Sequence, residues 1–262
     1  MKSTGNAFQQ LTEIVDTLMS DTGCPWDRVQ TRETLKPYLV EETYEALEAL
    51  DANDPERIKD ELGDLLYQIL FHAKISEQRG EFDMNGVIES ISQKMIRRHP
   101  HVFDKGDADT PEKVVDQWEE IKKTESAGRS RKSVLDGIPA HLPALARSQK
   151  LQKKAAKSGF DWDDIEDVFA KLDEEVAEFK EAVRSMDSQE ATSELGDMLF
   201  VMVNIAKFKK LDAEEALRQS NNKFIRRFQH IEAQAASLGR DLKSMTLEEM
   251  ETYWQEAKGK EI

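Results

Sequence analysis

E-E-V-A-E-F-K-E-A-V-R-S-M-D-S-Q-E-A-T-S-E-L-G-D, residues 174–197, is the stretch that decides the fold of this chain. It contains two pairs of acids, Glu175 with Glu178 and Glu194 with Asp197, and the members of each pair are three positions apart. That spacing places both carboxylates of a pair on one face of a helix. The polar segment between the pairs predicts a short turn, and two helices joined by a short turn pack antiparallel, so the four acids are expected to face one another. Converging carboxylates repel unless a cation lies among them, and oxygen-only ligands favour Mg²⁺ first and Mn²⁺ second.

The acidic pattern occurs a second time, and a constant offset relates the two copies. Glu42 and Asp64 lie 133 positions before Glu175 and Asp197 (175 − 42 and 197 − 64). The earlier copy comprises Glu41 and a second candidate set of metal ligands, Glu42, Glu45, Glu61 and Asp64. A glycine also repeats at this offset, as Gly63 and Gly196. Because glycine costs a helix about 1 kcal/mol relative to alanine, its repetition indicates a close helix approach or a ligand near the backbone.

Composition restricts the class of protein. A length of 262 residues allows one large domain or two small ones, and the internal repeat favours two. The net charge of −15 argues against nucleic acid or an anionic membrane as partner, because both need a basic surface. The single cysteine, Cys24, excludes an intrachain disulfide, and we find no apolar run of membrane length and no signal-peptide core. We therefore expect a cytoplasmic protein.

Apolar periodicity and turn residues predict an all-α chain, because no run of alternating β-branched residues is present. The expected helices cover residues 8–19, 34–50, 56–78, 85–98 and 111–123, then 144–157, 164–185, 188–210, 213–238 and a last helix capped by Thr246. The polar and basic stretch Ser126–Ser133 has no apolar periodicity. It indicates two domains, residues 1–125 and 144–262, joined by a linker at 126–143.

Two longer motifs repeat in the same order as the acids. G-C-P-W-D at 23–27 matches G-F-D-W-D at 159–163, with an offset of 136 (159 − 23). K-M-I-R-R-H-P-H at 94–101 matches K-F-I-R-R-F-Q-H at 223–230, with an offset of 129 (223 − 94). Small loop insertions and deletions explain the drift in offset.

A tryptophan–lysine pair completes each copy. Trp118 and Lys122 match Trp254 and Lys258, again with an offset of 136 (254 − 118). Each half thus combines acids, a Lys-x-x-Arg-Arg helix and a Trp-x-x-x-Lys helix. This mixture suggests a metal–polyphosphate site, in which the acids hold the cation, Lys and Arg neutralise phosphate charge, and an indole covers a base or closes the pocket.

The ordered set of motifs resembles the MazG-type nucleoside triphosphate pyrophosphohydrolases in their tandem two-domain form, over nearly the whole chain. The motifs that carry the resemblance are G-C-P-W-D, E-E-x-x-E with E-L-G-D, R-R-H-P-H-V-F, G-F-D-W-D and K-F-x-R-R-F. The resemblance implies an all-α helical bundle that usually forms a homodimer and needs Mg²⁺. It also implies cleavage of nucleoside triphosphates, ATP included, to nucleoside monophosphate and pyrophosphate, with broad base tolerance.

Carried over to this sequence, the resemblance implies specific contacts in the second half. The implied metal ligands are Glu175, Glu178, Glu194 and Asp197. The implied nucleotide contacts are Lys171, Glu190, Ser193, Lys223, Arg226, Arg227, Trp254 and Lys258. Residues 190–193 correspond to a loop that the family uses just before Glu194, and here that segment contains no lysine.

The expected chemistry is in-line attack of water on the α-phosphorus, a choice of phosphorus that only the resemblance supplies. Glu174 is the expected acceptor of the water's proton, and Glu175 acts beside it. Lys171, one turn before Glu175, brings charge to a phosphate, whereas the first half has Tyr38 at that offset and His99–His101 after its arginine pair. We therefore expect the second half to be the main catalytic unit. The first half would be a weaker site, a site of different specificity, or a module for dimerisation and stability.

Three alternatives stay open at this point. A di-iron or di-manganese carboxylate bundle normally needs Glu-x-x-His on facing helices, and neither acid pair has a histidine at the third position. A non-enzymatic helical interaction protein would use the acids only as a solvated face. A narrow pyrophosphatase for one nucleotide such as dUTP would share the acids, since the sequence identifies no base-reading residue.

Overall fold

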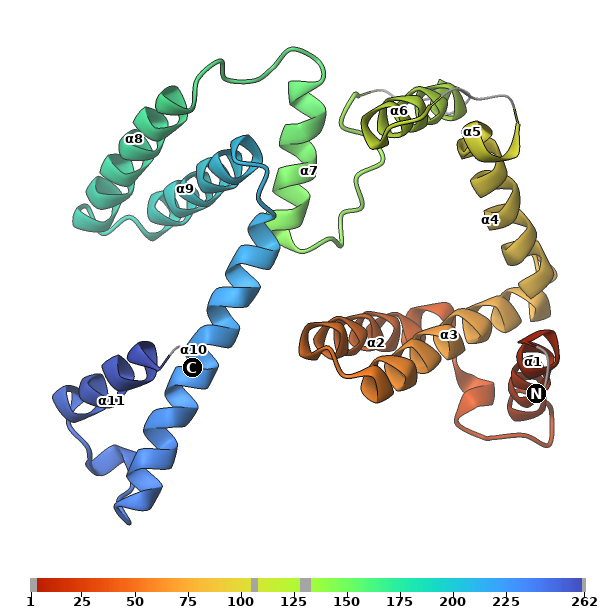
Figure 1. Ribbon diagram of the computed structural model, residues 1–262, viewed down its shortest axis with the longest axis horizontal. Coiled ribbons are helices and arrows are strands. Elements are labelled where there is room, and N and C mark those ends of the chain that lie inside the picture. Colours follow the sequence, from red (N-terminus) through yellow and green to blue (C-terminus); the bar gives the residue numbers. More distant parts are fainter. Residues whose placement is uncertain (1–3, 105–107, 128–132, 261–262) are drawn as a thin grey trace. The chain divides into compact units, whose positions relative to one another are not determined.

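The computed structural model describes residues 4–104, 108–127 and 133–260 (Figure 1). All regular secondary structure in these ranges is helical, so the predicted all-α class is confirmed. Within the same ranges, no helix combines the length and the apolar character that crossing a membrane requires. The chain divides into two compact units, Met1–Gly128 and Arg129–Ile262, each built from its own set of helices.

In the first unit, α1 and α2 both pack against the long helix α3, and α4 packs against α3 and α6. The elements of this unit are α1 (Thr4–Leu18), a 3₁₀ turn η1 (Asp27–Val29), α2 (Arg32–Ala52), α3 (Pro55–Gln78), α4 (Met84–Arg98), α5 (Pro100–Phe103) and α6 (Pro111–Ala127).

In the second unit, α8 and α9 form the main helix pair, α7 packs against α9 and α10, and α11 packs against α10. The elements are α7 (Ala144–Ala156), α8 (Ile165–Arg184), α9 (Ser188–Phe208), α10 (Ala213–Ser237), a 3₁₀ turn η2 (Leu242–Ser244) and α11 (Leu247–Gly259). The order α7–α8–α9 repeats the order α1–α2–α3.

The turn between the two acid-bearing helices is built in the same way in both units. Asp54 caps α3 by accepting hydrogen bonds from two backbone N–H groups, and Asp187, 133 positions later (187 − 54), caps α9 likewise. The residue before each cap, Asn53 or Met186, has a positive φ, 51° or 59°. A left-handed residue at the end of a helix turns the chain back on itself. The repeated turn therefore holds α2 against α3 and α8 against α9, with the acids between them.

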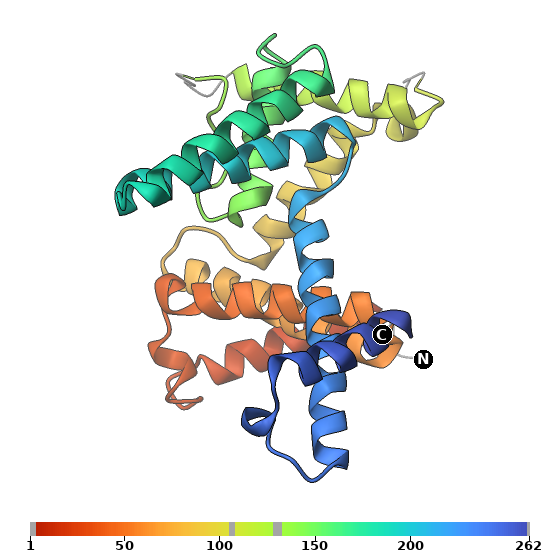
Figure 2. The same cartoon turned by 90° about the vertical axis from the view of Figure 1, so that its left-hand side faces the viewer.

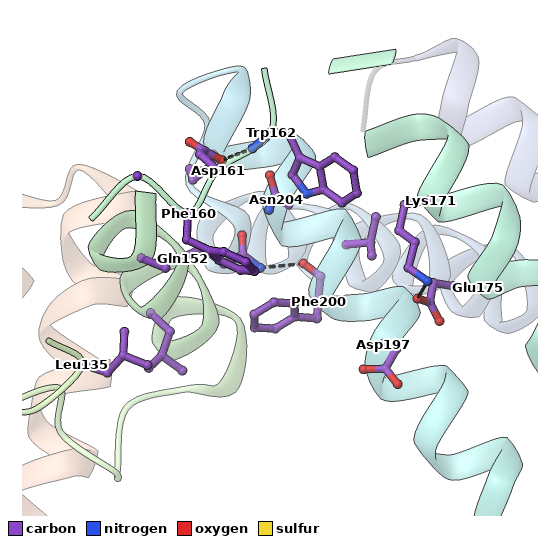
Figure 3. Close-up of a pocket in the computed structure, with 15 residues that line it drawn as sticks. Leu135, Gln152, Phe160, Asp161, Trp162, Lys171, Glu175, Asp197, Phe200 and Asn204 are labelled. Atoms are coloured by element: carbon purple, nitrogen blue, oxygen red, sulfur yellow. Dashed lines mark hydrogen bonds and ion pairs between the residues drawn. The ribbon is translucent and has the colours of Figure 1, made fainter. Parts of the chain in front are cut away.

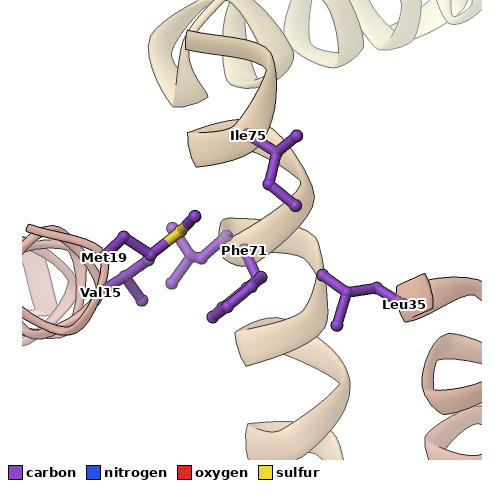
Figure 4. Close-up of a cluster of buried hydrophobic side chains, with 6 residues drawn as sticks. Val15, Met19, Leu35, Phe71 and Ile75 are labelled. Atoms are coloured by element: carbon purple, nitrogen blue, oxygen red, sulfur yellow. The ribbon is translucent and has the colours of Figure 1, made fainter. Parts of the chain in front are cut away.

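The first unit has a closed apolar core between α1, α2 and α3 (Figure 4). Its buried members are Val15, Met19, Leu35, Leu70, Phe71 and Ile75. Phe71 is among the most deeply buried side chains of the described chain, and it points from α3 toward α1. Burial of this apolar surface is the main force that holds α1 onto α3.

The repeated helix glycines do not mark a close helix approach within one chain. A Cβ built on Gly63 or Gly196 would meet no described atom within 4 Å. The interpretation of a close approach is therefore wrong inside the chain, because close packing would bring neighbouring atoms within that distance. A ligand or a second copy of the chain remains as a reason for the glycine.

The predicted long helices all occur, and their ends differ by a few residues from the expected ones. Within the described chain, the elements that the sequence did not predict are the short ones, α5, η1 and η2. The later part of the predicted linker contacts the second unit, because Lys154 of α7 donates a hydrogen bond to the carbonyl of Asp136 (2.6 Å). Residues 105–107, between the helices predicted at 85–98 and 111–123, and residues 128–132 of the predicted linker lie outside the described ranges.

Candidate active site

In the second unit, α8 and α9 bring three of the four predicted metal ligands together. Oxygens of Glu175, Glu194 and Asp197 lie within 4.8 Å of one another. Glu175 is only 5% exposed. Glu178 is exposed and outside this trio, but it is close enough for its charge to act on Glu194. Burial raises the pKa of Glu194, and the negative charges of Glu178, Glu175 and Asp197 raise it further.

A lysine lies at the edge of this acid cluster. The Nζ of Lys171 is 2.8 Å from a carboxylate oxygen of Glu174 and 2.9 Å from one of Glu175. Its hydrogen bonds to Glu174 and then to Glu175 raise the pKa of Lys171. The lysine therefore supplies the positive charge that the converging acids need in this structure.

The donor set fits a hard divalent cation. It consists of carboxylate oxygens alone, and three side chains present them within reach of one ion. Glu175 is buried, and the pKa of Glu194 is raised by burial and by the charges of its neighbours, a repulsion that a divalent cation would offset. Glu175, Glu194 and Asp197, with Glu178 beside them, are the residues that would hold such an ion.

A cavity of about 660 Å³ opens beside the acid cluster (Figure 3). Lys171, Glu175 and Asp197 form one end of it, and the aromatic side chains of Phe160, Trp162 and Phe200 line its body. Ligand pockets of proteins commonly have this size and this mixture of aromatic walls with a few polar groups. The volume suffices for a small organic ligand whose charged end reaches the acids.

The predicted basic contacts of α10 and α11 do not line this cavity. Arg227 lies over the ring of Trp254 (5.5 Å from the guanidinium carbon to the ring centroid), and Phe224 contacts the same indole (5.3 Å between centroids). Lys223, Arg226 and Lys258 are exposed on the same two helices. In both views, α11 packs along the part of α10 that lies away from α8 and α9 (Figures 1 and 2). Within one chain, the basic set is therefore separated from the acids.

Glu190 and Ser193 lie in the first turns of α9, where both are exposed. The loop that the resemblance implies at 190–193 is thus wrong, because Asp187 starts the helix before this segment. The backbone N–H of Glu190 donates to the cap carboxylate of Asp187 (3.0 Å).

The first unit assembles a similar acid cluster, with an arginine beside it in place of the lysine. Oxygens of Glu42, Glu45 and Glu61 lie within 4.8 Å of one another. Burial raises the pKa of Glu42, and the charge of Asp64, which lies outside the trio, adds to it. Arg57, one turn before Glu61, is 3.5 Å from its carboxylate.

The space beside this first cluster is differently filled. Tyr38, at the offset of Lys171, makes an edge contact with Trp26 (5.8 Å between ring centroids) instead of an ion pair. Phe71 of α3 and Met19 belong to the closed apolar core of this unit. The first unit also has a cavity, of about 450 Å³, but none of the clustered acids lines it, and its lining residues are Met19, Asp21, Pro25, Arg28, Val29 and Gln78.

The arginine pair of the first unit is neutralised. Arg97 and Arg98 are each 2.6 Å from an oxygen of Glu125 on α6. Trp118 contacts both His99 (4.9 Å between centroids) and the Arg98 guanidinium (5.8 Å). These contacts hold α6 against α4, and both arginines are paired with Glu125.

Several lining residues of the cavity were not predicted. Phe160, Asp161 and Trp162 belong to the repeated motif G-F-D-W-D at 159–163, whose pattern alone predicted no role in the site. Asn204 interrupts the apolar run M-L-F-V-M-V-N-I-A at 198–206, and a polar residue in such a run is a signal that was available. Gln152 and Leu135 carried no comparable signal.

Comparisons with known proteins identify sequence relatives of this chain. The profile of the MazG nucleotide pyrophosphohydrolase domain matches residues 30–103 and 164–232. A nucleoside triphosphate pyrophosphohydrolase/pyrophosphatase MazG of Thermotoga maritima is 43% identical over 99% of this chain and 98% of its own length. A nucleoside triphosphate pyrophosphohydrolase of Escherichia coli is 42% identical over 98% of this chain and 99% of its own. A crystal structure of a mazG-related protein from Thermotoga maritima covers 44% of this chain and 98% of its own, with 30% identity and a TM-score of 0.39.

Proposed function

Because this chain belongs to the MazG nucleotide pyrophosphohydrolase family and is a hydrolase acting on acid anhydrides, we propose that its second unit converts nucleoside triphosphates to nucleoside monophosphate and pyrophosphate. Full-length relatives named for this activity support the reaction, and they weigh against a non-enzymatic interaction protein. The proposal extends to a broad base range that includes ATP. It also extends to a divalent cation, Mg²⁺ first and Mn²⁺ second, because the donor set fits a hard cation.

The observation that carries the choice of unit is the cavity beside the second acid cluster. Glu175 and Asp197 line this cavity together with Lys171. A triphosphate held at the acids would therefore have room for its nucleoside in the second unit. In the first unit, the residues at the offsets of the cavity-lining Asn204 and Ala155 are Phe71 and Met19, and both belong to the closed apolar core. We accordingly assign residues 144–262 as the catalytic domain, 1–125 as a domain for stability and assembly, and 126–143 as the linker.

The residues of the second unit divide the proposed chemistry among them. A bound Mg²⁺ supplies charge neutralisation at the phosphates and orientation of the attacking water. Lys171 adds positive charge at the edge of the cluster, where a phosphate oxygen is a suitable partner. Glu174, 56% exposed and 2.8 Å from Lys171, takes the proton of the water. The water oxygen bonds to the α-phosphorus, and the bond from that phosphorus to the bridging oxygen breaks to release pyrophosphate.

A homodimer is also part of the proposal. Large apolar side chains are exposed along α9 and α10, among them Leu199, Met202, Phe224 and Ile225, and a second copy of the chain would cover them. The separation of the α10–α11 basic set from the acids supports an arrangement in which that set acts on the partner's site. Mixing two inactive variants, Glu175→Ala and Arg226→Ala, tests this arrangement. Recovery of activity in the mixture requires a site shared between chains.

Product analysis with ATP and Mg²⁺ tests the central proposal. The intact protein is expected to yield AMP and pyrophosphate. Glu175→Ala is expected to lose on the order of 10²-fold or more in turnover, the usual cost of removing one electrostatic contact to the reacting groups. Glu174→Gln is expected to lose turnover while it still binds the cation, as measured by calorimetry.

Glu42→Ala is the matched control, because it removes the corresponding acid of the first unit. Retained turnover in Glu42→Ala supports the choice of unit, and lost turnover assigns the activity to the first unit instead. If the intact protein acts on dUTP alone among the common nucleotides, the broad base range is wrong. If it produces no monophosphate from any of them, the proposed reaction is wrong.

A further inference from the structure

Two amide side chains line the cavity of the second unit and have oxygen atoms without a partner. Gln152 of α7 is 5% exposed and Asn204 of α9 is partly buried. The Oε1 of Gln152 and the Oδ1 of Asn204 are buried, and neither has a hydrogen-bond partner within the described part of the chain. Figure 3 shows both side chains on the cavity wall, between Phe160 and Trp162.

The orientation of the Gln152 amide is fixed. Its Nε2 donates to the backbone carbonyl of Phe200 (2.7 Å), so the opposite rotamer would set two oxygens against each other. Oε1 is therefore the acceptor end of the amide, and it is buried in the cavity wall that Gln152 helps to form. A buried acceptor without a partner destabilises a protein, which makes a ligand N–H or O–H a favourable neighbour.

The rest of the cavity indicates what kind of ligand brings that donor. Phe160, Trp162 and Phe200 offer faces on which a planar ring can stack. Glu175 and Asp197 lie at the other end, so a ligand that fills the cavity places its charged part at the acids. A nucleoside triphosphate has this distribution of groups, with an aromatic base at one end and phosphates at the other.

We propose that this cavity holds the nucleotide base, and that Gln152 Oε1, assisted by Asn204, accepts a hydrogen bond from an N–H group on the edge of the base. This assignment rests on the proposed function and adds a base-reading residue to it. Adenine, cytosine, guanine and uracil all carry at least one N–H donor on their pairing edges. An acceptor that needs only such a donor accounts for broad base tolerance, while a base without a donor is rejected.

The experiment compares ATP with purine riboside triphosphate, whose base has the same rings but no N–H donor on its pairing edge. The intact protein is expected to prefer ATP by about 5- to 150-fold in kcat/KM, the usual effect of leaving one buried polar group unpaired. Gln152→Met keeps the length of the side chain and removes the acceptor, so the preference is expected to fall toward one. Asn204→Leu is expected to reduce it in part.

Gln149→Met is the matched control on the same helix. Gln149 is 4% exposed and also donates to a backbone carbonyl, that of Leu211 (2.6 Å), but its Oε1 accepts from the N–H of Ala213 (3.4 Å). This glutamine does not line the cavity. Gln149→Met is therefore expected to lower Tm while it leaves the preference for ATP unchanged.

A binding measurement gives a readout apart from turnover. Without metal, AMP is expected to raise Tm of the intact protein more than purine riboside monophosphate does, and Gln152→Met is expected to remove the difference. Equal kcat/KM for the two triphosphates in the intact protein would overturn the proposal. An ATP preference that Gln152→Met and Gln149→Met both leave unchanged would also overturn it. A third contrary result is a dependence of kcat/KM on the 2′-hydroxyl of the nucleotide that Gln152→Met abolishes, because it would place the ribose, and not the base, in the cavity. Absence of pyrophosphate release from any nucleotide is a different result, and it contradicts the proposed function itself.

Discussion

Corresponding helices of the two units enclose different things. Helices α1 and α3 of the first unit enclose an apolar core, whereas α7 and α9 of the second unit line a cavity. In the first unit, Phe71 and Met19 close an apolar core between α1 and α3 (Figure 4). In the second, Asn204 stands at the offset of Phe71 (204 − 133 = 71) and Ala155 at that of Met19 (155 − 136 = 19). Asn204 and Ala155 are both smaller than the residues they correspond to, and both line the cavity; Figure 3 shows Asn204 there.

The acid clusters differ much less than the space beside them. Each unit gathers three carboxylates within 4.8 Å and adds one cation, Arg57 from α3 in the first and Lys171 from α8 in the second. A cluster of acids therefore occurs both in a unit whose corresponding helices enclose an apolar core and in one whose helices line a cavity. What distinguishes a candidate nucleotide site from its repeat is the volume and polarity of a few positions on α7 and α9.

Removal of the largest core side chain sharpens this comparison most. Phe71→Ala is expected to lower the free energy of unfolding of the first unit by about 3–5 kcal/mol, because it deletes a fully buried aromatic ring and leaves a void. Asn204→Ala, at the matched position, is expected to cost much less, since the cavity is already open there. Urea denaturation of both variants measures the difference, and equal losses would contradict the assignment of a closed core to one unit only.

The two tryptophans of the G-x-x-W-D motifs provide the next contrast. Trp162 lines the cavity, and Trp162→Ala is expected to raise KM for ATP by about 5- to 150-fold, the range measured for loss of one base–aromatic contact. Trp26 contacts Tyr38 in the first unit, so Trp26→Ala is expected to leave KM unchanged and to lower stability slightly. Steady-state kinetics of the two variants decide between a substrate contact and a packing role.

The repeated helix glycines give a smaller and opposite effect on stability. Gly63→Ala and Gly196→Ala are each expected to raise the free energy of unfolding by up to about 1 kcal/mol, because alanine favours the helix and the new methyl group meets nothing within 4 Å. If Gly196 faces a ligand or a second copy of the chain, Gly196→Ala lowers turnover or dimerisation while Gly63→Ala does not. Loss of stability in either variant would show an unrecognised neighbour.

A pH titration probes the arginine cluster of the first unit. Hydrogen bonds from Arg98 and Arg97 hold the pKa of Glu125 at about 2, below its ordinary value of 4.5. Because the folded pKa is the lower one, this carboxylate stabilises the unit above about pH 4.5 and loses that contribution as the pH falls toward about 2. Glu125→Gln should therefore be less stable than the intact protein at pH 7, with the difference shrinking below about pH 4.5. Glu112→Gln on the same helix is the control, and a pH-independent difference for Glu125→Gln would argue against the pair.

Much of this architecture could be predicted because it depends on patterns of residues that are close together in the sequence. The three-residue spacing of the acids, the caps at Asp54 and Asp187 and the repeat offset of 133 all act within one or two turns of helix. The cavity could not be predicted in the same way. Its lining comes from α7, α8, α9 and residue 135, so it depends on how separate helices approach one another. The position of the basic residues of α10 and α11, outside the lining of the cavity, depends on the same long-range packing, and their predicted contacts with the nucleotide stay a prediction.

The turn that joins the acid-bearing helices has a consequence for protein engineering. Its left-handed position is occupied by asparagine in the first unit and by methionine in the second, where the side chain is 88% exposed. Asparagine adopts this conformation more readily than methionine, and an exposed methionine side chain stabilises nothing by its burial. An internal repeat therefore suggests substitutions from one unit to the other. Met186→Asn places at the turn of the second unit the residue type that the first unit has at the corresponding position, Asn53.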